Sequence, residues 1–406
     1  MRWASVAVVI ALTAAPAWAQ GPQSPRPGER PPDPQQLQQP LRAPLTLTPT
    51  LTVTEEYNDN ILLDNSNRRW DFITAFTPGL GLNWESAVHR LAASYSFTSE
   101  IYARTPEFNG AFNRQNFTLD SFYKIDPTLT VSLTDAFNYD NNTNSINPQG
   151  IATGRTRSWG NMVAPGVNWR LSDVWTARAN ASYAIQRYPD ADLQDSDIYR
   201  VELGFDRRIT SRLTGTVGYE FDYLDIEPND LSTVHTPRLG FTYQVTQTIT
   251  VSANGGPAFQ IRDGRLEQVT PVARAAYTQR VFFGTVGVTF DRTIGAAGGL
   301  GGSTENTTIG ASVQVTTLAR GLILSFGPSY TMAESPDDRI DVRAITVPLQ
   351  VTYRVTEWLA LVGAYQFFHQ RSEGSATGQG AQSLAVNADQ NRVWLGVQFG
   401  YPIKVN

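Results

Sequence analysis

Apolar and polar residues alternate with a period of two through most of the chain after residue 44. In the clearest case, Trp70 to Trp84, every second residue is mostly apolar or aromatic and the intervening residues are mostly polar or small. This alternation predicts a β-strand with one apolar face. The segment is longer than the ~5–6 residues of a soluble strand and covers the ~9–11 residues that cross a bilayer at a tilt. Similar segments lie at 129–133, 175–185, 199–205, 213–223, 359–367 and 393–401.

Two kinds of connection separate these segments. Short turns of one design recur at Tyr123–Leu129, Trp169–Trp175, Arg208–Leu213, Tyr243–Ile249 and Tyr353–Leu359, with further turns near Glu85, Gln279 and Arg320. Longer connections rich in Asn, Asp, Gly and Pro alternate with them, at Asn58–Arg69, Thr105–Asn113, Asp140–Thr156, Pro189–Ser196, Glu227–Leu231, Asp263–Gly264, Thr293–Ser303, Glu334–Asp338 and Ser372–Asp389. Short turns at one end and long loops at the other are typical of outer-membrane barrels, with the turns in the periplasm.

The predicted fold class is all-β: a transmembrane antiparallel β-barrel. Eight turns and nine loops join eighteen strands, with sixteen as the alternative, and place both chain ends on the periplasmic side. An even number lets the first and last strands pair. Closure matters because each unpaired backbone group in hydrocarbon costs several kcal/mol.

Two features disagree with a regular barrel. Prolines fall inside proposed strands, and their similar settings predict a repeated β-bulge about six residues above the periplasmic rim. The prolines are Pro78, Pro165, Pro237, Pro271, Pro328 and Pro348. In addition, Asp135 and Arg207 fall at lipid-facing positions. They require an interfacial depth, a shifted register or a different strand phase.

The N-terminal region predicts export. A basic start, an apolar run and Ala17-Trp-Ala19 indicate a signal peptide over residues 1–19. Residues 20–44 are rich in proline and predict a disordered periplasmic segment, and residues 45–406 form the barrel. The absence of cysteine excludes disulfides and a lipoprotein anchor. The full chain has 32 basic and 37 acidic residues, and removal of the signal peptide takes away Arg2 and leaves 31 and 37. This excess of acidic residues argues against a nucleic-acid partner.

Charged residues of both signs recur on the predicted inward face. The pore-lining candidates are Arg90, Glu100, Arg104, Arg178, Arg200, Glu202, Asp206, Arg208, Glu220, Asp222, Arg238 and Arg392. Such rows shape the field of a pore and offer hydrogen bonds to hydroxyl-rich solutes. Alternatively, they only solvate the lumen and pair across neighbouring strands.

Other candidate chemistry is weaker. Most aromatic residues have lipid-facing phase and predict girdles at the membrane interfaces, which leaves Tyr102, Phe368 and Trp394 as inward candidates for stacking sugars. His89, His235 and His369 have no convincing catalytic partner, so no catalytic residue, metal ligand or cofactor is predicted. The glycine-rich stretch Gly298–Ser303 predicts a flexible loop rather than a phosphate site.

The opening of the barrel carries a family resemblance. The segments Tyr57-Asn-Asp-Asn60 and Pro78-Gly-Leu80 resemble the first hairpin of a β-barrel porin family associated with exopolysaccharide and exosortase gene clusters. The resemblance implies an outer-membrane conduit for a secreted polysaccharide, working with a periplasmic export lipoprotein. The chain departs from many barrels in ending on Pro402–Asn406 instead of an aromatic residue, so the signal read by the assembly machinery lies slightly inside the chain end.

Three functions remain open from the sequence. The first is a porin-like, non-enzymatic channel of the bacterial outer membrane that passes exopolysaccharide. The second is a general diffusion porin for small hydrophilic solutes. The third is a structural or adhesive surface barrel whose long loops bind a partner. All three have the lipid of the outer membrane and its barrel-assembly machinery as partners.

Overall fold

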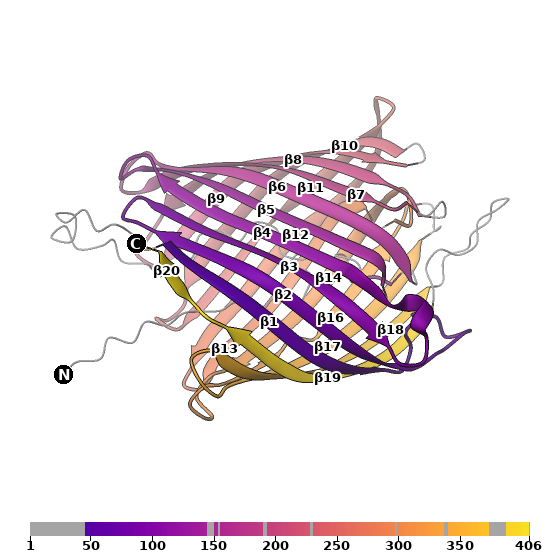
Figure 1. Cartoon of the computed structure of the whole chain (residues 1–406). Coiled ribbons are helices and arrows are strands. Elements are labelled where there is room, and N and C mark those ends of the chain that lie inside the picture. Colours follow the sequence, from indigo (N-terminus) through magenta and orange to yellow (C-terminus); the bar gives the residue numbers. More distant parts are fainter. Residues whose placement is uncertain are drawn as a thin grey trace, which may run out of the picture.

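The computed structural model describes residues 45–143, 150–152, 155–189, 193–227, 230–296, 299–336, 340–372 and 387–405. The segments predicted as signal peptide and proline-rich tether lie outside these residues. The described chain forms one antiparallel sheet closed into a barrel (Figure 1). Its strands are β1 (Leu45–Asn58), β2 (Asp71–Glu85), β3 (His89–Tyr102), β4 (Gly110–Lys124), β5 (Leu129–Thr143), β6 (Thr156–Arg170), β7 (Trp175–Arg187), β8 (Ser196–Arg208), β9 (Leu213–Ile226), β10 (Asp230–Gln244), β11 (Ile249–Arg262), β12 (Arg265–Val281), β13 (Gly284–Ala296), β14 (Ser303–Val315), β15 (Leu322–Phe326), β16 (Ser329–Glu334), β17 (Asp341–Arg354), β18 (Leu359–Ser372), β19 (Ala388–Gly400) and β20 (Ile403–Val405).

These segments make eighteen barrel strands, which confirms the prediction. Both β15 and β16 pair with β14 and β17, so they are two halves of one strand. The short β20 continues β19 along the same partner, β1. The barrel closes where β1 pairs with β19 over nine residues, from Thr50–Gly400 to Asn58–Arg392.

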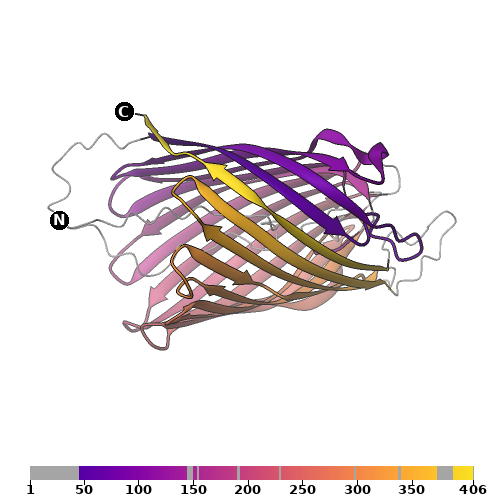
Figure 2. The same ribbon diagram turned by 60° about the horizontal axis from the view of Figure 1, so that its bottom comes forward.

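Both described chain ends lie at the short-turn end of the barrel. Leu45 at the start of β1 pairs with Val405 in β20. Figure 2 shows the first and last strands side by side, with the longer loops at the opposite end. The two ends are called the turn end and the loop end below.

Lipid and lumen select opposite faces of each strand. On β2, the alternate residues Phe72, Phe76, Leu80 and Trp84 are 37–50% exposed, whereas Ile73 on the other face is 2% exposed. In an antiparallel barrel one face must point outward along the whole strand. The wall therefore presents an apolar surface to its surroundings and a polar one to the lumen.

The recurring short turns share one hydrogen-bonding device. An oxygen-bearing side chain at the first turn position accepts backbone N–H groups two and three residues later, and this Asx or Ser/Thr turn sets the tight reversal. Asp126, for example, accepts the N–H groups of Thr128 and Leu129 at 2.6 and 3.0 Å. The hydroxyl of Thr128 also donates to this carboxyl, and these hydrogen bonds hold the pKa of Asp126 below its usual value. Ser86, Ser172, Thr210, Thr246 and Thr356 occupy the same place in their turns.

The predicted proline bulge is wrong. Pairing between β2 and β3 stops at Phe76–Ser99, next to Pro78, and resumes at Gly79–Ser96 without a shift of register. Pairing beside Pro237 is interrupted and resumes in the same way. Pro78 and Pro237 lack the N–H that one neighbouring strand would use, so the ladder pauses on that side and then resumes in the same register. The register shifts that do occur lie elsewhere, for example between Gln260 and Ile261.

The two lipid-facing charges are accommodated differently. The guanidinium of Arg207 lies over the ring of Trp175, 5.4 Å from its centroid, at the turn-end rim. This is the interfacial depth that the sequence required. Asp135 lies on the outward face within β5 and accepts a 3.0 Å hydrogen bond from Asn161 of β6. That bond partly satisfies a carboxylate which hydrocarbon could not solvate.

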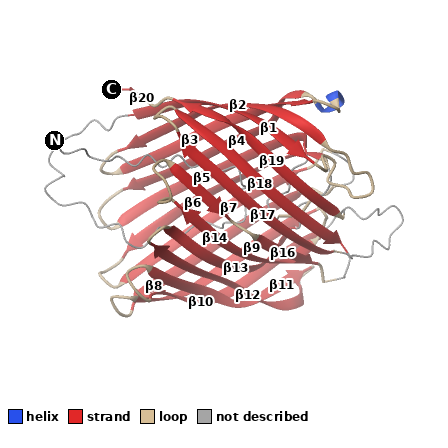
Figure 3. Cartoon of the chain, turned by 90° about the horizontal axis from the view of Figure 1, so that it is seen from below, coloured by secondary structure: helices blue, strands red, loops and turns tan. Residues whose placement is uncertain are grey.

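Helical structure is minor in the described chain. A 3-10 helix, Pro106–Phe108, follows β3 at the loop end (Figure 3). Among the residues described, no helix has the length and apolar character needed to cross a membrane.

The ion pair at the closure of the barrel generates a stability prediction. Arg392 of β19 donates from Nε and Nη2 to the two carboxylate oxygens of Glu56 of β1, both at 2.8 Å, and both side chains are nearly buried. Arg392→Met leaves Glu56 without this partner and should lower the free energy of unfolding by about 2–3 kcal/mol. Urea unfolding in detergent, followed by tryptophan fluorescence, measures the change. Arg212→Met, in an exposed short turn, is the control and should stay within about 0.5 kcal/mol. Equal midpoints for the two variants would show that this pair does not secure the closure.

Candidate functional site: the barrel lumen

A charged cluster lies on the inner wall formed by β8 to β13. The carboxylate of Glu220 lies 2.6, 3.5 and 3.9 Å from the guanidinium groups of Arg238, Arg274 and Arg200. Arg200 also binds Asp222 of the same strand as Glu220. Glu220, Asp222 and Arg238 are 2–5% exposed, so these charges depend on one another rather than on water.

A second cluster lines the opposite wall near the loop end. Arg114 of β4 lies 3.0 Å from the carboxylate of Glu100 in β3. Glu100 also accepts a 2.8 Å hydrogen bond from the hydroxyl of Tyr102. The Glu56–Arg392 pair belongs to the same wall, because β1 lies between β19 and β2.

The structure brings most predicted pore-lining residues to the inner wall. Arg178 and Asp206 form a pair at 2.7 Å, nearer the turn end than Arg200. Glu202 lies opposite Glu220 on the neighbouring strand. Arg90 lies near the turn-end rim, opposite Glu85. Arg208 also lies at this rim, where its guanidinium binds the backbone carbonyl of Asp173 in a short turn.

The prediction for Arg104 is wrong. Arg104 follows the end of β3, and its guanidinium stacks on the ring of Trp70 at 3.8 Å from the centroid. Trp70 itself contacts Tyr57 and Phe72, whose rings lie on the outward face. The alternation that predicts an inward position stops where β3 ends at Tyr102, so Arg104 belongs to the outer rim.

Sequence reasoning missed several members of the two clusters. Arg274 and Asp291 pair at 3.0 Å on β12 and β13 and extend the first cluster, and Glu56 and Arg114 belong to the second. The same period of two that found the other residues assigns these four to the inward face.

Residues 150–152 of the β5–β6 loop lie against the wall formed by β16 to β18. Ile151 is fully buried against Ala333, Ile340 and Val342, and Ala152 packs with residues of β17 and β18. The side chain of Gln370 in β18 binds both backbone groups of Ala152, accepting its N–H at 2.8 Å and donating to its carbonyl at 2.7 Å. This wall lies well around the barrel from β5 and β6, so residues 150–152 lie far from the strands that this loop joins.

The β1–β2 loop also folds inward. Ile61 packs with Ile73 and Tyr102, and Leu63 packs with Ala152 and Phe368. Tyr102 and Phe368 are 2% and 0% exposed, so in this conformation they support loops instead of offering faces to a sugar. The third inward aromatic candidate, Trp394, is half-buried, and the guanidinium of Arg392 lies 5.6 Å from the centroid of its ring.

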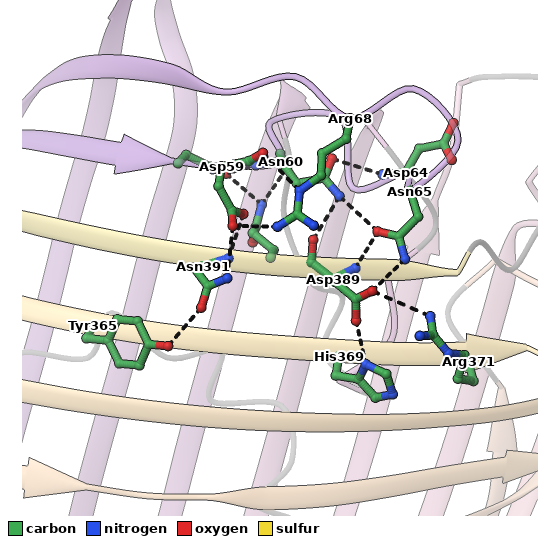
Figure 4. A network of polar contacts seen from close by, with 12 residues as sticks. Asp59, Asn60, Asp64, Asn65, Arg68, Tyr365, His369, Arg371, Asp389 and Asn391 are labelled. Atoms are coloured by element: carbon green, nitrogen blue, oxygen red, sulfur yellow. Dashed lines mark hydrogen bonds and ion pairs between the residues drawn. The ribbon is translucent and has the colours of Figure 1, made fainter.

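A polar network fastens the β1–β2 loop to the closure of the barrel (Figure 4). Asn391 of β19 donates from its backbone N–H and its amide to the carboxylate of Asp59, at 2.8 and 2.9 Å. Asn65 donates to the carboxylate of Asp389 at 2.7 Å, and Asp389 also binds His369 and Arg371. In the Tyr-Asn-Asp-Asn motif, Asn58 and Asn60 are fully buried, and Gln390 donates to both. The motif therefore has a structural role here: it joins the first loop to the last strand.

Other loops meet these two. Leu300, in the β13–β14 connection, packs against the cluster around Ile151. Gly299 accepts a 2.9 Å hydrogen bond from the N–H of Gln194 in the β7–β8 loop. The described part of the stretch predicted to be a flexible loop is thus packed, and Ser303 already belongs to β14. Described residues of loops from four parts of the circumference therefore contact one another or the inner wall at the loop end.

The histidines lie away from the lumen clusters. His89 bonds to Ser121 near the turn end, His235 to the hydroxyl of Tyr219 on the outer face, and His369 to Asp389. Within the described ranges, no group of three metal-binding side chains is placed to hold a metal ion.

The closed barrel, the apolar outer face and the polar lumen define the class: a bacterial outer-membrane β-barrel with porin-like architecture. No protein-family model matches the chain, and no curated protein matches it. Among solved structures, the chain is similar to the outer-membrane protein OpdK of Pseudomonas aeruginosa, at 10% identity over 88% of this chain and 99% of that one, with a TM-score of 0.45. It is similar to OccAB4 of Acinetobacter baumannii at 11% identity, over 89% and 99% of the two chains, with a TM-score of 0.43. It is also similar to the siderophore receptor PirA of P. aeruginosa, at 10% identity over 87% of this chain and 80% of that one, with a TM-score of 0.42.

The Glu220 cluster generates a prediction for ion selectivity. Glu220→Gln removes the carboxylate that three arginines share, so the lumen should become more attractive to anions. The reversal potential across a planar bilayer under a KCl gradient should shift towards anion preference. Asp291→Asn, at the more exposed edge of the cluster, should shift it in the same direction with less disturbance of the wall.

Glu357→Gln, in an exposed short turn, is the matched control for this measurement and should leave the reversal potential unchanged. If both cluster variants kept the wild-type value as well, the cluster would not lie on the path of the ions.

Proposed function

We propose that the protein is a non-enzymatic channel for hydrophilic solutes. The observation that carries the proposal is the lumen itself, lined by opposed arginines and carboxylates inside a closed barrel of eighteen strands. A barrel of this number of strands is wide enough for water, and charged walls suit polar solutes. The barrel supplies no energy itself: a solute moves down its own gradient or is driven by energy supplied elsewhere.

The loop end controls how much of the lumen a solute can use. Apolar side chains that would be unfavourable in a water-filled pore are covered by the loops they contact, as Ile151 and Ala333 cover each other. The loop end is therefore narrow in this conformation, and passage of a large solute requires the loops to separate.

The proposed cargo is a secreted polysaccharide. Support comes from the family resemblance of the first hairpin, together with a lumen rich in groups that hydrogen-bond to hydroxyls. A periplasmic export protein at the turn end would deliver the chain. The general diffusion porin is the alternative, and the wall chemistry suits small polar solutes equally well.

The loop contacts generate a conductance prediction. Purified protein in planar bilayers should give discrete current steps, and Gln370→Ala should raise the mean current because the β5–β6 loop loses both bonds from that side chain. Gln366→Ala is the matched control, since Gln366 lies on the same face of β18 nearer the middle of the wall, and its current should equal that of the wild type. A barrel that passes no ions in any of the three forms would refute the channel.

Deletion of the gene tests the cargo. We expect surface polysaccharide to fall and polymer to accumulate in the periplasm, and the intact gene should restore both. Chemical analysis of surface and periplasmic sugar gives the readout, with uptake of small sugars measured in parallel. Normal polysaccharide together with slower uptake would refute the export proposal and favour the general porin.

A further inference from the structure

The wall divides between β12 and β13. Their ladder runs from Val281–Gly284 to Ala273–Arg292 and stops there. Towards the loop end, residues 265–272 of β12 pair with β11 alone, and residues 293–296 of β13 pair with β14 alone. We call residues 293–296 and 303–306 the tongue.

The tongue lies inside the barrel, against the inner wall of β9 to β12. Alternation gives Ile294 and Ala296 the lipid-facing phase of Val288, which is 45% exposed, yet they are only 4% and 6% exposed. They pack in one cluster with inward-facing residues of the neighbouring wall. These residues are Leu224, Ile226, Val234, Ala258 and Val272. The outward face of the tongue therefore rests on the inner face of four other strands.

Polar contacts fix the same position. Gln260 of β11 donates to the hydroxyl of Ser303 at 2.7 Å, and the hydroxyl of Thr270 donates to Glu305 at 2.7 Å. Gln260 and Thr270 face inward and are 0% and 3% exposed, whereas Ser303 and Glu305 have outward phase on β14. Every described contact of this surface thus joins the outer face of the tongue to the inner face of the wall.

Proline marks the point of division. Pro271 is the second residue of β12 past the last β12–β13 pair, and it cannot donate a backbone hydrogen bond. Beside Pro237 the ladder to the next strand resumes in register, but beside Pro271 it does not. The free edge of β12 keeps the geometry to accept β13: continuing the register would place Thr293 opposite Val272 and Ala296 opposite Val269.

Two positions of the tongue follow from this geometry. In one, its apolar face covers the inner wall, as in this structure. In the other, residues 293–296 pair with the edge of β12, Ile294 and Ala296 turn outward as their phase requires, and the lumen widens at the loop end. An apolar patch inside a water-filled lumen is unfavourable unless something covers it, so the patch favours the inward position.

We infer that the tongue is the gate of the channel: docked on the inner wall it restricts the lumen, and paired with β12 it opens it. This inference rests on the proposed channel function. Gating by a strand that exchanges one partner surface for another is a two-state device of the kind that packed interfaces provide.

Cysteine chemistry tests the gate in a chain that has no native cysteine. Gln260→Cys with Ser303→Cys, joined by a short reductant-cleavable crosslinker, should hold the tongue inward and lower the mean current at least about twofold, with recovery on reduction. Val269→Cys with Ala296→Cys should form a disulfide only when the tongue pairs with β12, and should hold the current high. Tyr223→Cys with Thr233→Cys, opposite each other on β9 and β10, is the control and should leave the current unchanged.

Substitution of the proline gives an independent test of the gate. Pro271→Thr supplies the missing N–H and should increase the fraction of time in the high-current state, whereas Pro237→Thr should not. If both crosslinked variants and Pro271→Thr give the same mean current as the wild type, the gate is overturned but the channel is not. Absence of current from all forms, the Val269–Ala296 disulfide included, would overturn the channel and the gate together.

Discussion

Backbone hydrogen bonding in hydrocarbon is the constraint on which the rest of this structure depends. A strand that crosses a bilayer must have a partner on each side, because lipid offers none and each unpaired group costs several kcal/mol. The pairing of β1 with β19 meets this requirement, and it fixes the even number of strands and the two chain ends at the turn end. Beside Pro78 the ladder pauses and resumes in register, so the wall stays paired there.

The constraint weakens towards the loop end, and the structure changes character there. Residues 265–272 of β12 are free of β13, residues 293–296 leave the edge of β12, and Glu305 and Asn306 still pair with β16. Several inward-facing side chains in this region are apolar. Similar apolar clusters receive Ile61, Leu63 and Ile151 from the loops. The lumen therefore has two regions: a polar one within the regular wall and an apolar one that the chain covers with its own loops and tongue.

Much of the wall follows from local pattern. A period of two and the alternation of short turn and long loop predict the strands, their number and their outward face, because these features depend on neighbours in sequence and on one lipid boundary. The prediction for Arg104 fails because this residue lies two positions beyond the end of β3, where the period no longer applies.

The arrangement at the loop end could not be predicted in this way. Ile151 and Ala152 look like minor apolar residues in a polar loop, and their partners in β16 to β18 are far away in the sequence. Alternation along β13 predicts that Ile294 faces lipid. Ile294 does lie on the outward face of its strand, but this face packs against the inner wall of the barrel instead of lipid.

The placement of Ile294 explains how one strand can have two partners. In a regular barrel the outward face of a strand has no protein to meet, so its phase decides its surroundings. Where the ladder beside Pro271 fails to resume, the same face can reach the inner wall, and the inward residues of β9 to β12 are apolar where they receive it. The cost of losing the β12 ladder is offset by burial of that patch. The lost hydrogen bonds to β12 and the burial of the apolar patch concern the same few residues. A substitution at Pro271 therefore acts directly on the free-energy difference between the two positions of the tongue.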